Sequence, residues 1–361
     1  MGRARPLLKL LISAALLSSC GRVPSLPAVP QPQPSAPTET PAPLPDLDLP
    51  LPDLPFYPPG SQAMEKIYAP IVILDSREPS PLTSVEAHMR VGVSLQGDFS
   101  KKSITVEPLV QGPELSKYAQ PVLNRFGQDY LLFLNARRQR AAFQNTVYVN
   151  KTENGAFTYL QYWFFYSYND TKMLGGPPGG IVQKCGNHEA DWEHMSLRIN
   201  TQIFQKARTE QDYLNAIDDI YLSQHTRFQH LDRKWFRQGQ LAFQGTHVQV
   251  YPANGSHATY PRPGRYFMQN LAGFKTYDIN DGLGQKIDTS QGNLANIREQ
   301  PWFSYGGRWG AINHDVCNLV EAVSPASNDG PYGPGHGDQP YWFYQSDWYG
   351  VNRPVVTPVN G

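Results

Sequence analysis

The sequence predicts a mainly β protein: a single large β-sandwich domain with a few decorating helices and long loops. Residues 157–168 form a run of aromatic and β-branched residues, which is typical of a central strand covered on both faces. Shorter apolar runs alternate with Gly- and Pro-rich turns, and helical periodicity is confined to two segments. Many strands with few, scattered helices favour a sandwich.

The predicted strands, in chain order, are residues 68–74, 104–110, 157–168, 191–199, 217–223 and 246–251. The second is the weakest because Pro108 has no N–H for a sheet ladder. The two helix candidates are residues 115–139 and 202–216. Gly- and Asn-rich segments at 175–180, 254–255 and 281–282 are predicted loops.

The N-terminal 60 residues differ in composition from the rest of the 361-residue chain. Residues 1–19 join a basic start to an apolar core too short to span a membrane, as in an export signal. The segment ending in Cys20 resembles a bacterial lipobox, which predicts lipidation of Cys20; an ordinary cleaved signal is the alternative. Of 33 prolines, 14 lie between residues 22 and 60, so residues 20–60 are a predicted spacer. Residues 61–361 are the predicted sandwich domain.

Charge and cysteine content restrict the partners. The whole chain has 31 basic and 31 acidic residues, and removing residues 1–19 takes away three basic ones, which leaves a net charge of −3. This balance predicts no nucleic-acid partner, and it predicts that lipid holds the protein at a membrane. The expected location is the bacterial cell envelope, at the outer membrane if one is present. Cys185 and Cys317 either pair as a disulfide in this oxidising compartment or are two buried free thiols.

The densest polar segment is residues 186–199. On a strand, alternate residues share a face, so Asp191 and Glu193 would precede three apolar residues on one face, with His188 just before them. Two carboxylates and an imidazole suit a divalent cation, Mg²⁺ or Ca²⁺ above all, whereas a solvated strand end is the alternative. Trp192 and His194 would point to the other face as packing residues.

Two further histidines follow predicted strands in turn-rich segments, where functional residues often lie. His257 and His225 are therefore candidate ligand-binding residues converging with His188 on one polar cleft, although each alone is more often structural. The sequence has no nucleophile elbow, phosphate loop, zinc-protease helix motif or dinucleotide fingerprint.

Five blocks in order resemble the Vps62-related family, whose plant members carry a domain of unknown function. The blocks lie at residues 68–86, 160–169, 186–199, 256–264 and 301–310, and the third resembles the family's G-x-H-x-x-D-W-E-H signature. This resemblance implies the fold and the place of the site, but no established chemistry.

The same signature is more distantly similar to necrosis-inducing, NPP1-type proteins. These β-sandwiches bind a divalent cation beside a G-H-R-H-D-W-E heptapeptide and damage plant membranes after binding sphingolipid sugars. The resemblance implies metal roles for His188, Asp191 and Glu193, and for Asp170 after the aromatic strand. Ala190 replaces the second heptapeptide histidine, which argues against cytolytic activity.

The main functional hypothesis is a lipid-anchored envelope protein that binds a glycan or a lipid headgroup through a divalent cation. One alternative is a metal-dependent envelope hydrolase, with Glu193 or His257 as general base toward a metal-bound water. The other is a structural envelope protein without pocket chemistry.

Overall fold

The computed structural model describes residues 63–99, 102–119, 130–170, 187–225, 227–233, 241–271, 274–310 and 330–335. All of them belong to one unit, Leu51–Gly361. The predicted signal, the spacer, the 175–180 loop and the three cysteines (Cys20, Cys185, Cys317) lie outside these residues, so lipidation and disulfide pairing stay predictions. In the described ranges, no helix has the length and apolar character needed to cross a bilayer.

The predicted aromatic strand is β7 (Phe157–Asn169), in the middle of a seven-stranded sheet of order β10-β9-β8-β7-β6-β17, with β2 also paired to β7. From Thr158 onward every residue of β7 is buried, so both faces are covered as predicted. β17 runs parallel to β6, and the other pairs are antiparallel. The partner strands are β2 (Leu82–Thr83), β6 (Thr146–Asn154), β8 (His188–Asn200), β9 (Ile217–Gln224), β10 (Arg227–Asp232) and β17 (Asn293–Asn296).

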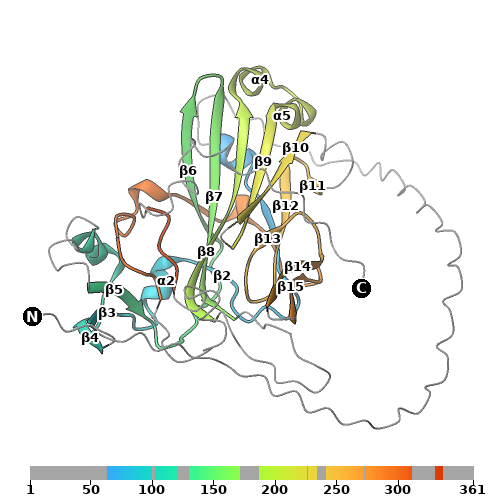
Figure 1. Ribbon diagram of the computed structural model, residues 1–361. Coiled ribbons are helices and arrows are strands. Elements are labelled where there is room, and N and C mark those ends of the chain that lie inside the picture. The colour runs from blue at the N-terminus through green and yellow to red at the C-terminus, as the bar shows by residue number, and fades with distance from the viewer. Residues whose placement is uncertain are drawn as a thin grey trace, which may run out of the picture. The chain divides into compact units, whose positions relative to one another are not determined.

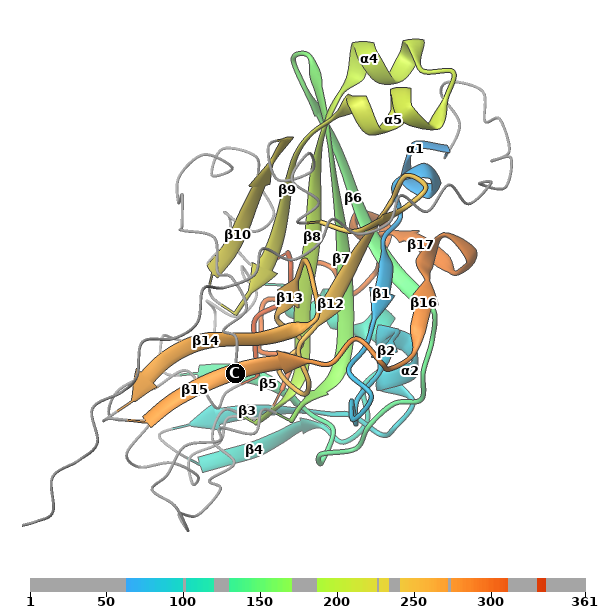
Figure 2. The ribbon, with the colours of Figure 1, turned by 90° about the vertical axis from the view of Figure 1, so that its right-hand side faces the viewer.

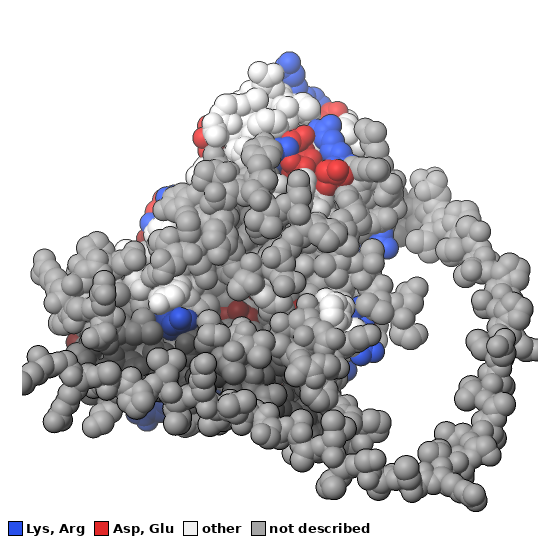
Figure 3. All heavy atoms as spheres, viewed as in Figure 1, with Lys and Arg blue, Asp and Glu red and all other residues white. Residues whose placement is uncertain are grey.

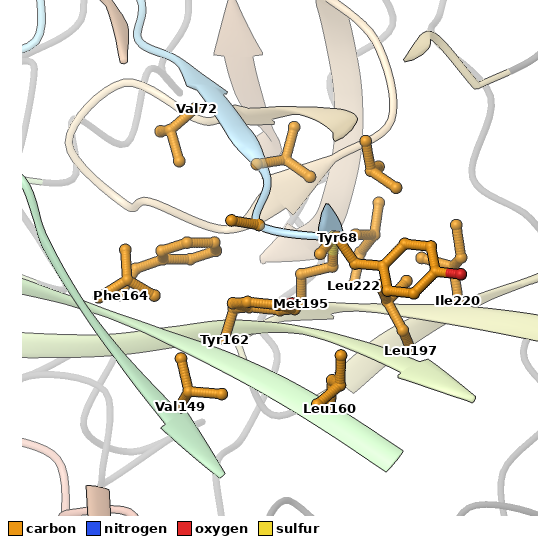
Figure 4. Packing of buried hydrophobic residues seen from close by; sticks show 14 of the residues in the cluster. Tyr68, Val72, Val149, Leu160, Tyr162, Phe164, Met195, Leu197, Ile220 and Leu222 are labelled. Carbon is orange, nitrogen blue, oxygen red and sulfur yellow. The ribbon is translucent and has the colours of Figure 1, made fainter. Parts of the chain in front are cut away.

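A second sheet faces the first and completes the predicted sandwich (Figure 2). Its order is β11-β12-β1-β16, with β13 beside β12, and β1 runs parallel to β12. One apolar core fills the space between the two sheets; Val72 and Val250 contribute from the second sheet and Leu160 and Leu197 from the first (Figure 4). The strands are β1 (Ile71–Ile73), β11 (Phe243–Gln244), β12 (His247–Pro252), β13 (Thr259–Tyr260) and β16 (Lys286–Asp288).

Two small sheets flank the sandwich (Figure 1). One has the order β4-β3-β5 and the other is the β14–β15 hairpin. β4 ends before Pro108, as the missing N–H of that residue requires. A second apolar cluster, rich in tryptophan, covers the opposite face of β7 and β8. The strands are β3 (Ser94–Phe99), β4 (Lys102–Glu107), β5 (Tyr130–Asn135), β14 (Gly264–Leu271) and β15 (Phe274–Asn280).

Helices are short, and the predicted helix at 115–139 is wrong. A 3₁₀ helix and then a strand, η1 and β5, occupy the described part of that segment. The consecutive apolar residues Leu132, Phe133 and Leu134 are all buried, which suits a strand covered on both faces better than a helix with one apolar stripe. The helices are α1 (Ala63–Ile67), α2 (Val85–Met89), α4 (Thr201–Lys206), α5 (Glu210–Ala216), η1 (Gly112–Tyr118), η3 (Thr289–Gln291) and η4 (Ile297–Glu299).

The second predicted helix, at 202–216, is two helices. α4 ends at Lys206, and a new start signal follows: the Thr209 side chain accepts a hydrogen bond from Asp212 N while Asp212 caps Thr209 N in return. This reciprocal capping box fixes a separate first turn for α5. The two helices lie together where β8 ends and β9 begins (Figure 2).

Candidate functional site

β8 runs from a charged end into an apolar interior, as its alternation predicts. Met195 and Leu197 lie in the core between the two sheets, and Trp192 packs in the cluster on the opposite face. Asp191 and Glu193 precede them on the side of Met195 and are only 7% and 2% exposed. The two carboxylates are therefore buried beneath the surface, not placed in solvent at a strand end.

His194 is a packing residue, as predicted. Its ring packs at a tilt against Trp163, with centroids 4.5 Å apart, and its Nδ1 lies 3.0 Å from Ser196 Oγ. Burial lowers the pKa of His194 to about 3, so this imidazole is neutral at pH 7.

His257 is the centre of the charged region. Its Nδ1 lies 3.0 Å from Asp191 Oδ2, and its Nε2 lies 3.3 Å from Glu78 Oε1. The ring is fully buried and stacks face to face on Tyr166, with centroids 3.8 Å apart. Burial alone would lower the pKa of His257, but the Glu78 and Asp191 carboxylates outweigh it and raise the pKa to about 10. At neutral pH the ring is thus an imidazolium with both N–H groups donated to carboxylates.

Glu193 lies on the other side of Asp191. It accepts hydrogen bonds from the Ser223 hydroxyl and, at 3.2 Å, from the backbone N–H of His225. Burial is the main cause that raises the pKa of Glu193 to about 8, and the neighbouring Asp191 charge adds to it. Glu193 therefore holds a proton at neutral pH.

His225 forms a second imidazole–carboxylate pair at the rim. Its Nε2 lies 2.8 Å from Asp278 Oδ2, and Asp278 also accepts hydrogen bonds from Ser256 and Tyr260. Burial lowers the pKa of His225, but Asp278 raises it more, to about 9. Because its side chain is 33% exposed, this ion pair is screened more than that of His257. We call Glu78, Asp191, Glu193, His225, His257 and Asp278 the polar cluster.

The polar cluster carries more acid than base: four carboxyl groups face two imidazoles. The hydroxyl of Tyr166, under the His257 ring, is buried and has no hydrogen-bond partner among the described residues. Burial raises the pKa of Tyr166 well above its ordinary value, so the hydroxyl remains a neutral donor. An unpaired buried donor next to excess carboxylate favours a further polar occupant, either water or ligand.

His188 and Asp170 lie at the edge of the polar cluster. His188 Nδ1 is 2.7 Å from the Ala190 carbonyl oxygen, which can only accept, so the proton is on Nδ1 and the Nε2 lone pair is left for another group. Asp170 instead pairs with Arg140, with Oδ2 and Nη2 3.2 Å apart. Within the described ranges, no three His, Cys, Asp or Glu side chains are arranged to hold a metal ion. The structure thus brings Asp191, Glu193, His225 and His257 together and gives Asp170 a different partner.

Backbone strain is concentrated at this site. Among the described residues, five non-glycine residues have a positive φ between 52° and 59°: Arg137, Arg138, Ala190, His225 and His257. Such conformations cost on the order of 1–3 kcal/mol each and persist only where surrounding contacts enforce them. Two of the five belong to the polar cluster, and Ala190 is next to Asp191.

The remaining two strained residues are held by Glu189, which precedes Ala190. The buried Glu189 carboxylate accepts hydrogen bonds from Ala136 N at 2.8 Å and from Arg138 N at 2.5 Å. A Cβ at Gly310 would collide with the Glu189 backbone, so only glycine permits this packing. Residues 136–141, which we call the arginine loop, are thereby fixed to the start of β8.

Sequence reasoning missed Glu78, Asp278 and Tyr166. Glu78 and Asp278 come from loop and hairpin positions 179 and 53 residues from their histidine partners, and no local pattern links them. Tyr166 belongs to a strand in which eight of 13 residues are aromatic, so nothing in the sequence singles it out. Glu189 lies within the polar segment 186–199, but the sequence pattern assigned it no role of its own.

Comparison with known families identifies one that spans most of the chain. The family described as "Vacuolar protein sorting-associated protein 62" matches residues 53–326, which confirms the resemblance drawn from the five blocks. A search of the curated proteins returns no match.

The solved structures returned include necrosis-inducing proteins, the second group that the sequence resembles. Necrosis and ethylene inducing protein 2 from the causal agent of cocoa's witches' broom disease is 12% identical over 78% of this chain and 96% of its own, with a TM-score of 0.31. The non-toxic HaNLP3 protein is 12% identical over 73% and 87%, with a TM-score of 0.32. NLPPya in complex with mannosamine is 11% identical over 74% and 88%, with a TM-score of 0.29.

Proposed function

This chain belongs to the vacuolar protein sorting-associated protein 62 family, and from that premise we propose that it is a ligand-binding protein of the bacterial envelope. Its ligand is a glycan or a polar lipid headgroup, taken by the polar cluster. One observation carries the proposal: left-handed backbone at Ala190, His225 and His257 accompanies two imidazole–carboxylate pairs, one fully buried at His257 and one partly exposed at His225. Strain combined with buried charge costs stability, and proteins retain such arrangements at functional sites.

A divalent cation, Mg²⁺ or Ca²⁺, is the second part of the proposal. Asp191, Glu193, His188 and Asp170 are the residues that would hold it. Two observations fit this donor set: Asp191 Oδ1 has no partner among the described residues, and His188 keeps Nε2 free by donating Nδ1–H to a carbonyl, as metal-bound histidines do. A cation would offset the excess carboxylate charge and leave coordination positions for ligand oxygens.

Hydrolysis is the alternative, and the protonation states weaken it. A general base needs a free lone pair, whereas both nitrogens of His257 face carboxylates and its pKa is raised to about 10. Glu193, with a pKa of about 8, is protonated at neutral pH and suits an acid better than a base. Binding without turnover therefore agrees better with the polar cluster.

Anchoring through lipid on Cys20 completes the proposal. The 20–60 spacer would hold the domain away from the membrane in an extended form, and the outer membrane is the expected site in a cell that has one. Mass spectrometry of the protein from membranes tests this directly. A mature N-terminus at Cys20 carrying acyl chains is expected, and an unmodified N-terminus elsewhere would contradict it.

Ligand binding is tested by calorimetric titration of mannosamine, whose ammonium and hydroxyl groups complement carboxylates and a neutral tyrosine donor. The wild type is expected to bind it with saturation, and Asp191→Asn to bind at least tenfold more weakly because the central carboxylate is lost. Glu153→Gln, which removes an exposed carboxylate from β6, is the matched control and should bind like the wild type. Equal binding by all three proteins would place any sugar site elsewhere.

The cation is tested separately, by melting in Mg²⁺ or Ca²⁺ and again in chelator. Binding at one hundred times the dissociation constant adds about 2.7 kcal/mol to the stability of the wild type. Asp191→Asn and His188→Ala should lose this cation-linked increase, whatever their own melting temperatures. A wild type that melts identically in chelator and in both cations would remove the metal from the proposal.

A further inference from the structure

The arginine loop, residues 136–141, displays three arginines within four positions. Arg137 and Arg138 are exposed, and neither side chain forms a hydrogen bond or an ion pair with another described residue. Arg198, by contrast, pairs with both Asp218 and Asp219. Figure 3 shows such mixing, with acidic and basic side chains next to one another at its upper end. The loop is therefore a local excess of positive charge.

The loop backbone is preorganised. Glu189 accepts from two of its N–H groups, and Asn135 Oδ1 accepts from Arg137 N at 2.8 Å. These contacts hold Arg137 and Arg138 in consecutive left-handed conformations, which few arginines adopt. A fixed backbone presents neighbouring guanidinium groups without the ordering cost that a flexible loop would incur on binding.

The loop also lies next to the polar cluster. Arg140 Cζ is 4.9 Å from the centre of the Tyr168 ring, and its Nη2 contacts Asp170. Burial raises the pKa of Tyr168, and the charges of Arg138 and Arg140 oppose that rise. The backbone N–H of Asp170 in turn donates to Gly255 O at 2.8 Å, in the turn that carries His257. The arginine loop and the polar cluster are thus neighbours.

The geometry points to a phosphate-binding site on the arginine loop, in which Arg137 and Arg138 bind the phosphate group of a ligand and Arg140 lies beside them. Guanidinium groups form paired N–H···O bonds that match phosphate oxygens, and two unpaired arginines balance a dianion. The inference rests on the proposed ligand-binding function and assigns the anionic part of that ligand. Such a phosphate comes from a lipid headgroup or from a soluble phosphate, and the test separates these sources.

The test is calorimetry of the full chain at low ionic strength with two probes, inorganic phosphate and a water-soluble short-chain phosphatidylglycerol. The wild type is expected to bind at least one of them, and R137Q/R138Q at least tenfold more weakly. R137G/R138G should show the same loss, because glycine fits the left-handed backbone and keeps the loop shape. The matched control, R90Q/K206Q, removes two exposed cations elsewhere and should bind like the wild type.

Each outcome decides the inference. Binding of the lipid alone would identify a headgroup phosphodiester as the ligand group, and binding of inorganic phosphate would identify a free phosphate group. A wild type that binds neither probe, or loop variants that bind as tightly as the wild type, would overturn the inference. Mannosamine binding and cation-linked melting do not depend on the arginine loop, so measured on the same proteins they show whether the proposed function itself has failed.

Discussion

The two ends of one face of β8 carry different kinds of side chain: apolar at one end and charged at the other. At one end Met195, Leu197 and Ile199 fill the core between the sheets (Figure 4). At the other end Asp191 and Glu193 are nearly as buried, but they face His257 and the backbone of His225. The two-residue period of the strand places all five side chains on one face. The two ends therefore differ in how burial of their side chains affects the stability of the protein.

Burial stabilises the apolar end directly, by about 1.5–3 kcal/mol for each large side chain removed from water. At the charged end burial opposes ionisation, and the partners do little more than offset that cost. In proteins generally, replacing buried ion pairs by well-packed apolar residues is often neutral or stabilising. Under the proposed function the charged end is kept for binding a ligand, and three predictions test the contrast between the two ends.

The largest expected effect comes from His257→Leu. This change leaves the Asp191 and Glu78 carboxylates buried without the imidazolium that both of them contact. We expect a loss of about 3–5 kcal/mol in the free energy of unfolding, measured by chemical denaturation. The triple variant with Glu78→Gln and Asp191→Asn also present should recover much of this loss, because no unpaired charge remains. A triple variant as unstable as the single one would show that His257 acts by packing on Tyr166.

Leu197→Ala tests the apolar end. Leu197 is fully buried between the sheets, so the cavity left behind should cost about 2–5 kcal/mol in the free energy of unfolding. Leu109→Ala is the matched control: Leu109 is 56% exposed, and its loss should change stability by less than about 0.5 kcal/mol. Mannosamine binding by Leu197→Ala should equal that of the wild type, unlike binding by variants at the charged end.

The pH dependence of stability tests the charge states of both imidazoles together. Unfolded histidine titrates near pH 6.5, and the folded pKa values of His257 and His225 are raised to about 10 and about 9. The folded state therefore binds protons that the unfolded state has lost, and stability falls as pH rises through this window, by at most about 1.4 kcal/mol per pH unit for each imidazole. The raised pKa of Glu193, about 8, acts in the same direction above pH 4.5.

Denaturation at pH 6.5, 8 and 9.5 measures this slope, and removing the imidazole in His257→Leu should flatten it. At acid pH the trend reverses, because the pKa of Asp278 is held below its ordinary value and protonation of this carboxyl is destabilising. A wild type whose stability rises steadily from pH 6.5 to 9.5 would contradict the assignment of His257 and His225 as imidazolium ions paired with carboxylates.

The local sequence pattern predicted the structure correctly wherever a single strand or helix determined it. The alternation around Asp191 predicted the direction of β8, and the aromatic run predicted a central strand at β7. The helix predicted at 115–139 failed because the apolar run at β5 pairs with β3, a strand about 35 residues earlier in the chain, and such pairing overrides local periodicity. His225 and His257 were predicted as candidate ligand-binding residues, but no nearby sequence pattern identified the carboxylates that pair with them.

The sequence by itself determined which residue types could do chemistry, which family the chain belongs to and which face of β8 carries Asp191 and Glu193. Only the tertiary structure decided the charge states of His257 and His225, because these depend on Glu78 and Asp278, which folding brings from distant segments. It also decided that Glu189, to which the sequence pattern assigned no role, fixes the arginine loop beside the polar cluster. Periodicity is a local property of the chain, whereas the electrostatics of a buried group depend on everything packed around it.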